Sequence, residues 1–62
     1  LLNIQFNSSQ TKNIKIYNLN SQLIDEIQSN ENIVRYKFNS KGVYIIYVNE
    51  AGKIYYNKVI VN

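Results

Sequence analysis

The sequence contains no cysteine, histidine, proline, methionine or tryptophan, and only two of its 62 residues are glycine. Without cysteine or histidine, neither a disulfide nor a zinc site of the usual ligands can hold the chain together. The same absences exclude Ser–His, Cys–His and His-based acid–base catalysis. Only four acidic residues remain as good metal ligands. The composition therefore predicts a protein that is not an enzyme and that uses no metal or other cofactor.

Charge and hydrophobic runs are also limited. Seven Lys and Arg residues against four Asp and Glu residues give a net charge of +3. This balance permits weak attraction to anionic partners but is far from the basic footprint of a nucleic-acid-binding protein. No apolar run approaches the roughly 18 residues of a membrane-spanning helix, and the N-terminus does not resemble a signal peptide. An exported parent protein would carry its address elsewhere in its chain.

The residues that are abundant favour β-strands joined by turns. The sequence has ten Ile, five Val, six Tyr and two Phe, but a single Ala. β-Branched and aromatic side chains suit a pleated, half-buried surface, whereas helical domains usually contain several Ala. The eleven Asn residues suit the joints between strands, because Asn tolerates the left-handed backbone region.

Alternation of apolar and polar residues predicts six strands, at residues 2–6, 12–17, 22–28, 33–38, 43–48 and 53–61. The third strand requires a bulge between Leu23 and Ile24 to keep its period of two. The fifth is apolar on both faces, which is typical of a central strand. Polar segments such as residues 7–11 separate the strands, and Gly52 suits the left-handed position of a short hairpin loop. This pattern predicts one all-β domain, an antiparallel sandwich or a small barrel.

The acidic residues do not form a recognisable catalytic or metal-binding group. Asp25 and Glu26 are adjacent on a predicted strand, so their side chains point to opposite faces. Glu31 and Glu50 fall in predicted loops, and nothing in the sequence brings them together.

Basic residues and tyrosines are interleaved near residues 15–17, 35–37 and 53–58. Such a surface could stack single-stranded bases or sugar rings. Two alternatives therefore stay open: a small basic single-stranded nucleic-acid-binding β-barrel, and a surface adhesion or carbohydrate-binding module. The pair Lys41-Gly42 begins like an RNA-recognition motif, but Val43 and Ile45 stand where stacking aromatics are needed. We therefore expect no nucleic-acid partner, and the tyrosines also suit cross-strand packing.

Three stretches, in this order, resemble the C-terminal sorting domain of type IX secretion cargo proteins in Bacteroidota (type A, or Por secretion). Residues 14–24 (IKIYNLNSQLI) are similar to the "IYNLNGQLV" strand–turn–strand of that family. Residues 41–48 (KGVYIIYV) are similar to its "KGVYxVxV" segment, and residues 52–62 (GKIYYNKVIVN) to its terminal strand. Each motif alone is degenerate, but three at this spacing are fairly specific and cover essentially residues 2–62.

The sequence departs from the family pattern at several positions. Ser21 stands where the family usually has Gly, which is expected to strain that turn. Asn39-Ser40 replaces the usual Leu-Pro, and Asn57 stands where a second Lys is common. The opening "YPNP" segment would fall just before Leu1. Residues 1–62 are thus expected to form a single domain whose opening segment lies upstream, leaving an under-paired strand edge.

The resemblance implies a small antiparallel Ig-like β-sandwich of about six to seven strands, with no catalytic role. The implied function is a C-terminal secretion signal that directs an N-terminal cargo domain of the same chain through the periplasm and outer membrane. The cargo would then be secreted or held at the cell surface. The implied partners are the outer-membrane type IX translocon and a surface sortase. Self-association through an open strand edge is a further partner expectation.

The resemblance also suggests which residues the translocon contacts, by strand addition or docking of the hairpin at residues 43–61. The candidate recognition residues are Lys41, Gly42, Tyr44, Lys53, Lys58, Val59, Ile60 and Val61. The three lysines would orient the encounter, and Gly42 would give the backbone freedom ahead of Tyr44. A purely structural role is the alternative for Gly42, Tyr44 and the terminal apolar run.

Overall fold

In the computed structural model, which describes residues 1–7 and 9–62, the chain is built from strands joined by short turns. The strands are β1 (Leu2–Gln5), β2 (Lys12–Asn18), β3 (Leu23–Ser29), β4 (Ile33–Tyr36), β5 (Gly42–Glu50) and β6 (Lys53–Val61). Within the described ranges, no helix is long and apolar enough to cross a membrane. The prediction of an all-β domain with six strands is confirmed.

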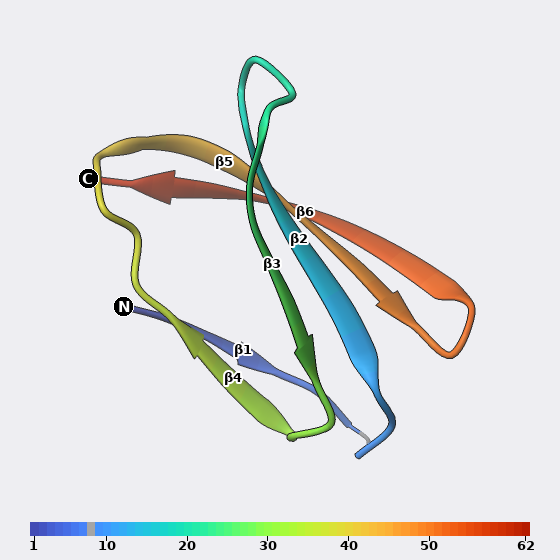
Figure 1. Ribbon diagram of the computed structural model, residues 1–62. Coiled ribbons are helices and arrows are strands. Elements are labelled where there is room, and N and C mark those ends of the chain that lie inside the picture. Colours follow the sequence, from blue (N-terminus) through green and yellow to red (C-terminus); the bar gives the residue numbers. More distant parts are fainter. Residues whose placement is uncertain (8) are drawn as a thin grey trace.

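The strands form two antiparallel sheets that pack as a sandwich (Figure 1). One sheet has the order β3-β2-β5-β6, and the other pairs β1 with β4. Strand β5 lies between β2 and β6, as its two apolar faces predicted. The open two-on-four arrangement corresponds to the sandwich prediction rather than to a closed barrel.

The core lies between the two sheets. Alternate residues of β2 and β5 point inward, and Ile14 and Ile16 are completely buried. The small sheet covers them with Val34 and with partly buried side chains of β1, among them Leu2 and Ile4. The period-two pattern of the sequence therefore marks the inward face of each of these strands correctly.

Strand β3 contains the predicted bulge. Ile16 pairs with Asp25 whereas the next residue, Tyr17, pairs with Leu23, so Ile24 is the extra residue. Asp25 then shares the inward side of the sheet with Ile16, and Glu26 faces outward opposite Lys15. The two adjacent carboxylates lie on opposite faces, as expected.

Two strands end earlier than predicted. Strand β1 stops at Gln5, although the Phe6 N–H still donates to the Asn32 carbonyl at 2.7 Å. Strand β4 stops at Tyr36, and Phe38 leaves the sheet to pack against the rings of Tyr36 and Tyr44 at centroid distances of 4.9 and 4.4 Å. Ring packing overrides the alternation there. The predicted turn at residues 7–11 includes Ser8, which lies outside the described residues.

Two turns contain residues with positive φ, one at a position without glycine and one at a position where the sequence predicted glycine to take this conformation. In the β2–β3 turn Ser21 has φ of 64°, the left-handed value that the missing glycine would accept more easily. In the β5–β6 hairpin Ala51 and Gly52 have φ of 52° and 83°. The positive φ at both central residues identifies a type I′ turn, which confirms the expected role of Gly52.

Candidate functional site

The pairing of β5 with β6 joins two of the sequence motifs at one end of the four-stranded sheet. Gly42 pairs with Val61, and Tyr44 pairs with Val59. The exposed Lys41 precedes this pairing, and the C-terminal end of the chain lies beside it (Figure 1). We call this region, formed by residues 41–44 and 58–62, the terminal end of the sheet.

Tyr44 is part of the core at the terminal end. Only 7% of its surface is exposed, and its hydroxyl donates to the Ser40 carbonyl at 2.8 Å. The Ser40 hydroxyl also lies 3.0 Å from the Tyr44 hydroxyl oxygen. A tyrosine hydroxyl bonded to backbone a few residues upstream is a recurring feature of Ig-like sandwiches. Tyr44 therefore fixes the turn that carries Lys41 and offers little surface to a partner.

Gly42, two residues before Tyr44, has a backbone conformation that favours glycine. Its φ is 152°, a backbone conformation that residues with a Cβ rarely adopt. A Cβ at this position would lie 3.8 Å from the Tyr44 ring and hydroxyl, an ordinary contact distance. Backbone conformation, rather than lack of space, is thus the reason for glycine here.

The terminal apolar run divides between the two faces of β6. Val59 and Val61 point inward and pack against the core. Ile60 lies on the outer face, where 63% of its surface is exposed, and the exposed Lys58 shares that face. Because β6 is the last strand of its sheet, its outer backbone edge is unpaired within the described part of the chain. A partner can therefore reach Lys58, Ile60 and this edge, whereas the Val59 and Val61 side chains are partly buried against the core.

Lys53 does not belong to the terminal end. It pairs with Glu50 next to the β5–β6 turn. Eight residues of extended strand, about 27 Å at roughly 3.4 Å per residue, separate it from Val61. The three candidate lysines therefore do not form one cluster, and Lys53 marks the opposite end of the sheet.

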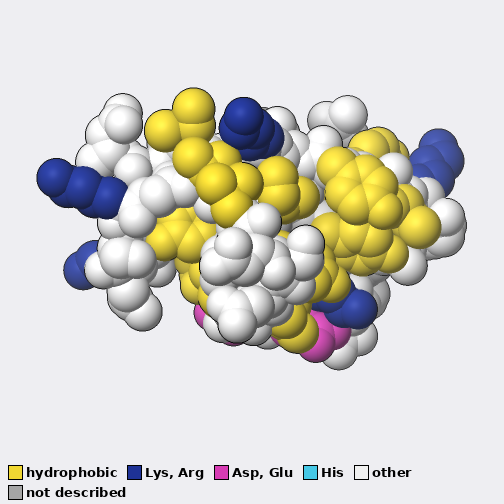
Figure 2. All heavy atoms as spheres, turned by 90° about the horizontal axis from the view of Figure 1, so that it is seen from above, with side chains coloured by type: hydrophobic (Ala, Val, Ile, Leu, Met, Phe, Trp, Pro, Cys, Tyr) yellow, Lys and Arg dark blue, Asp and Glu magenta, His cyan; other side chains and the backbone are white. Residues whose placement is uncertain are grey.

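The outer face of the sheet continues from the terminal end as rows of side chains that the sequence analysis did not align. Tyr17, Ile45 and Lys58 are cross-strand neighbours in one row. Lys15, Tyr47 and Tyr56 form the next, with the Lys15 ammonium 5.8 Å from the Tyr47 ring centroid and the two rings 5.3 Å apart. Figure 2 shows hydrophobic side chains reaching the surface, with Lys and Arg side chains among and around them. The second apolar face of residues 43–48 was the signal for this surface.

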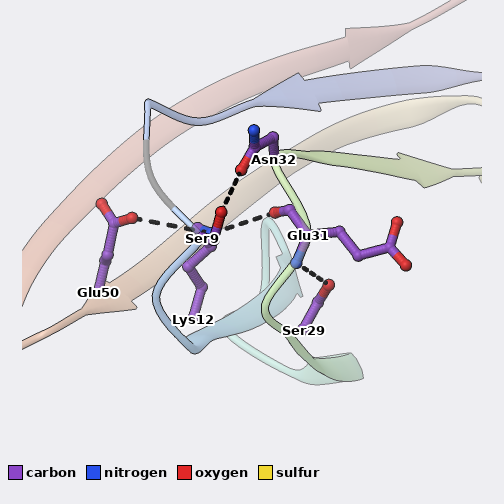
Figure 3. Close-up of polar contacts among 6 residues, drawn as sticks. All are labelled: Ser9, Lys12, Ser29, Glu31, Asn32 and Glu50. Atoms are coloured by element: carbon purple, nitrogen blue, oxygen red, sulfur yellow. Dashed lines mark hydrogen bonds and ion pairs between the residues drawn. The ribbon is translucent and has the colours of Figure 1, made fainter.

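A second site that sequence reasoning missed is a buried lysine at the opposite end of the molecule (Figure 3). The Lys12 side chain is completely buried. Its ammonium donates to the Glu31 carbonyl at 3.1 Å, lies 3.9 Å from the Glu50 carboxylate, and sits 4.8 Å from the centroid of the Phe6 ring. These contacts join β2 to three other parts of the chain, so the role of Lys12 is to hold the two sheets together.

Residues 1–7 and 9–62 contain no group of three or more His, Cys, Asp or Glu side chains placed to hold a metal ion. The distinctive features are instead an open strand edge, an apolar outer face and exposed lysines. Such an arrangement suits recognition by another protein.

Comparison with known proteins identifies a family. A family model described as "Secretion system C-terminal sorting domain" matches residues 1–62. No curated protein and no solved structure matches the sequence. The family match spans all three motifs that meet or flank the terminal end of the sheet.

Proposed function

The chain belongs to the family of secretion system C-terminal sorting domains, and from this premise we propose that the type IX translocon of the outer membrane recognises it directly. Family membership implies a larger cargo chain, a secretion system and export across the outer membrane, and the family is non-catalytic. Recognition by the translocon would then direct the upstream cargo to the cell surface or the medium. A surface sortase would act on the domain after export.

The observation that carries this proposal is the side-by-side position of two motifs at the terminal end of the sheet, where Gly42 pairs with Val61. The translocon would contact the exposed Lys58 and Ile60, together with the open edge of β6, by strand addition. Lys41 would steer the encounter by its charge. Gly42 and Tyr44 would act indirectly by holding the turn before β5, and the inward Val59 and Val61 by keeping β6 in the sheet.

The test is the export of a reporter that is preceded by a signal peptide and followed by the sorting domain with its native upstream segment, in a bacterium with type IX secretion. Removing residues 58–62 is expected to abolish export. Since this truncation also removes half of β6, two point variants make a sharper comparison. We expect Ile60→Asp and Lys41→Glu to lower the exported fraction at least about tenfold, because each places a negative charge at the terminal end.

Matched controls lie at the other end of the same strand. Ile54→Asp changes an isoleucine of which 51% is exposed on the same outer face, and Lys53→Glu reverses the charge next to the turn. Both should be exported at close to the wild-type level. Equal losses in the control and test variants would contradict recognition at the terminal end. A wild-type reporter retained in the periplasm would contradict the sorting function itself.

A further inference from the structure

Within the part of the chain that the structure describes, the four-stranded sheet has two unpaired edges, β3 and β6 (Figure 1). Strand β3 carries the bulge at Ile24 and two adjacent carboxylates, Asp25 and Glu26. Bulges and charged side chains are the usual features that keep an edge strand from pairing with another chain. Strand β6 pairs with β5 in one continuous register, and its only charged side chains are Lys53 and Lys58. It is therefore the edge better suited to pair with another strand.

The hairpin turn determines which backbone groups of β6 point away from the sheet. In a type I′ hairpin with two turn residues, the flanking residues, here Glu50 and Lys53, form a hydrogen-bonded pair. The backbone groups of Lys53 therefore face β5, and the direction alternates along the strand. The residues whose N–H and C=O groups face outward are Ile54, Tyr56, Lys58 and Ile60.

The small sheet leaves this edge accessible, because it stops one strand short of the large sheet. Ile46 and Val48 of β5 point inward and are buried. Their partners on the inward side of β6, Asn57 and Tyr55, are exposed. Together with β1, these residues line a groove of about 720 Å³. Strand β6 therefore projects beyond β1, and a second copy can approach it edge to edge without the two small sheets meeting.

We propose that two copies of the domain pair through β6, antiparallel and around a two-fold axis at Asn57, and so join their large sheets into one continuous sheet. Ile54 then lies opposite Ile60 of the second copy on the outer face, and Tyr55 lies opposite Val59 on the inward side. Both copies use the same surface, so the two-fold axis repeats each contact. Ile54, Tyr55 and Ile60 are exposed in the single domain, and pairing buries their apolar surface.

The side chains of β6 favour this register over its neighbours. Outward-facing backbone groups must lie opposite each other, so the register can shift only in steps of two residues. A register centred on Lys58 places two ammonium groups directly opposite each other, which is destabilising. A register centred on Tyr56 places Ile60 opposite the turn residue Gly52 and loses an apolar pair. Centred on Asn57, each Lys58 instead faces a Tyr56 ring, and a cation–π contact can form.

This pairing would cover the surface that the proposed function assigns to the translocon. Lys58, Ile60 and the outer edge of β6 take part in both contacts, so one domain cannot make both at once. If the proposed function holds, the paired domain is hidden from the translocon until the copies separate. A contact along one strand edge is small compared with a permanent interface, so we expect the pairing to be reversible and to depend on protein concentration.

Disulfide cross-linking tests the register, since the domain has no cysteine of its own. The experiment uses the full cargo chain, and the same chain without the introduced cysteine measures the background. Asn57→Cys places two cysteines at a non-hydrogen-bonded pair, where a Cα separation of about 4.5 Å suits a disulfide. We expect this variant to form linked dimers at least about tenfold faster than Gln28→Cys, which places an exposed cysteine on β3. Equal rates for the two variants would overturn the proposal.

A mixing experiment gives a second test of the same register. Chains with Ile54→Cys and chains with Ile60→Cys should cross-link when mixed, because the register places residue 54 opposite residue 60. Neither should cross-link alone, since six residues of strand, about 20 Å, separate like cysteines. Cross-linking of each variant alone at the rate of the mixture would contradict this register.

Sedimentation of the cargo chain over a range of concentrations measures the association itself. We expect Tyr56→Lys to weaken association at least about tenfold, because it places like charges opposite Lys58, and Tyr56→Glu to strengthen it. Both variants lose the same ring contact with Tyr47. Gln28→Lys and Gln28→Glu change the net charge equally at the β3 edge and should leave association unchanged.

Two results of the sedimentation experiment would overturn the proposal. One is a shift of association in the same direction by both Tyr56 variants, and the other is a wild-type chain whose mass does not rise with concentration. Neither cross-linking nor sedimentation involves the translocon or export. Failure of self-pairing is therefore distinct from failure of the sorting function.

Discussion

Ser21 adopts a left-handed backbone conformation that is costly for a residue with a side chain. The turn around it is otherwise well bonded, since the Asn18 side-chain oxygen accepts from the N–H groups of Asn20 and Gln22 at 2.9 and 3.0 Å. A left-handed conformation costs a non-glycine residue roughly 1–2 kcal/mol. Glycine avoids this cost, but part of the gain is offset because glycine also increases the conformational entropy of the unfolded chain. We expect Ser21→Gly to raise the free energy of unfolding by about 1 kcal/mol, measured by denaturant unfolding.

The neighbouring Asn20→Gly variant is the control for this prediction. Among the described residues, only Ser21 and Ala51 have positive φ without being glycine, so Asn20 gains nothing from the substitution. It should leave stability unchanged or lower it. A Ser21→Gly protein no more stable than wild type would show that the turn does not strain the backbone.

Tyr36 makes stability depend on alkaline pH. Burial, and then the hydrogen bond and charge of Asp25, raise the pKa of the Tyr36 phenol above its usual value of 10.0. Below that value the phenol is neutral in both the folded and the unfolded chain, and the contribution of the neutral Tyr36 to folding stability is fully present. As the pH rises above it, the phenol of the unfolded chain ionises first, which favours unfolding. The loss of stability continues until the pH passes the raised pKa of the folded phenol.

We therefore expect the free energy of unfolding to fall above pH 10, and to fall less steeply in Tyr36→Phe. Urea titrations between pH 8.5 and pH 11.5, about 1.5 units on either side of the ordinary tyrosine pKa, measure this slope. Tyr56→Phe removes a hydroxyl from an exposed ring and should keep the wild-type profile. Identical slopes for Tyr36→Phe and wild type would contradict the prediction.

At the scale of the elements, the β5–β6 hairpin contains a second non-glycine residue, Ala51, in a left-handed backbone conformation, which lowers stability as it does at Ser21. A type I′ turn requires positive φ at both central residues, and Asn-Gly is the favoured pair, whereas the chain has Ala-Gly. We expect Ala51→Asn to stabilise the domain by about 0.5–1 kcal/mol, because Asn tolerates the left-handed region. The corresponding rise in melting temperature is about 2–8 °C for a domain of this size, measurable by calorimetry.

A β-branched residue at the same position gives the opposite result. Ala51→Val should lower the melting temperature, because a branched side chain fits positive φ poorly. If Asn and Val shifted the melting temperature in the same direction, the turn type assigned to residues 50–53 would be wrong.

The elements were predictable from the sequence where one rule dominated. Period-two alternation located all six strands, and the broken period at Leu23 and Ile24 located the bulge. The ends of β1 and β4 were not predictable, because Phe38 alternates correctly with its neighbours but leaves the sheet to meet Tyr44. Packing between residues distant in sequence determines where these strands end, and the alternation of apolar and polar residues contains no information about that packing.

At the scale of the whole molecule, the sequence identified the motifs but not their spatial relation. The pairing of Gly42 with Val61 and the distance of Lys53 from both follow from the β5–β6 register. The groove beside β1 follows from the offset of the two sheets, which no local pattern encodes. Lys12 looked like the start of an ordinary strand, yet it is completely buried where four segments of the chain meet.

The contacts of Lys12 yield the last prediction, which concerns the joint between the two sheets. Glu50 lies 3.9 Å from the buried ammonium, and its own side chain is 16% exposed. Removing one partner of a buried pair destabilises because the remaining charge loses its compensation, whereas replacing both partners by neutral groups is often tolerated.

We expect Glu50→Gln to lower the free energy of unfolding by about 2 kcal/mol, less than the 3–5 kcal/mol of a fully buried pair. The double variant Lys12→Met/Glu50→Gln should recover at least half of this loss, because no buried charge remains. Denaturant unfolding of the wild type, the two single variants Lys12→Met and Glu50→Gln, and the double variant gives the coupling energy directly. Additive losses in the double variant would mean that Lys12 holds the sheets together through its hydrogen bond to Glu31 and its packing on Phe6, independently of the Glu50 charge.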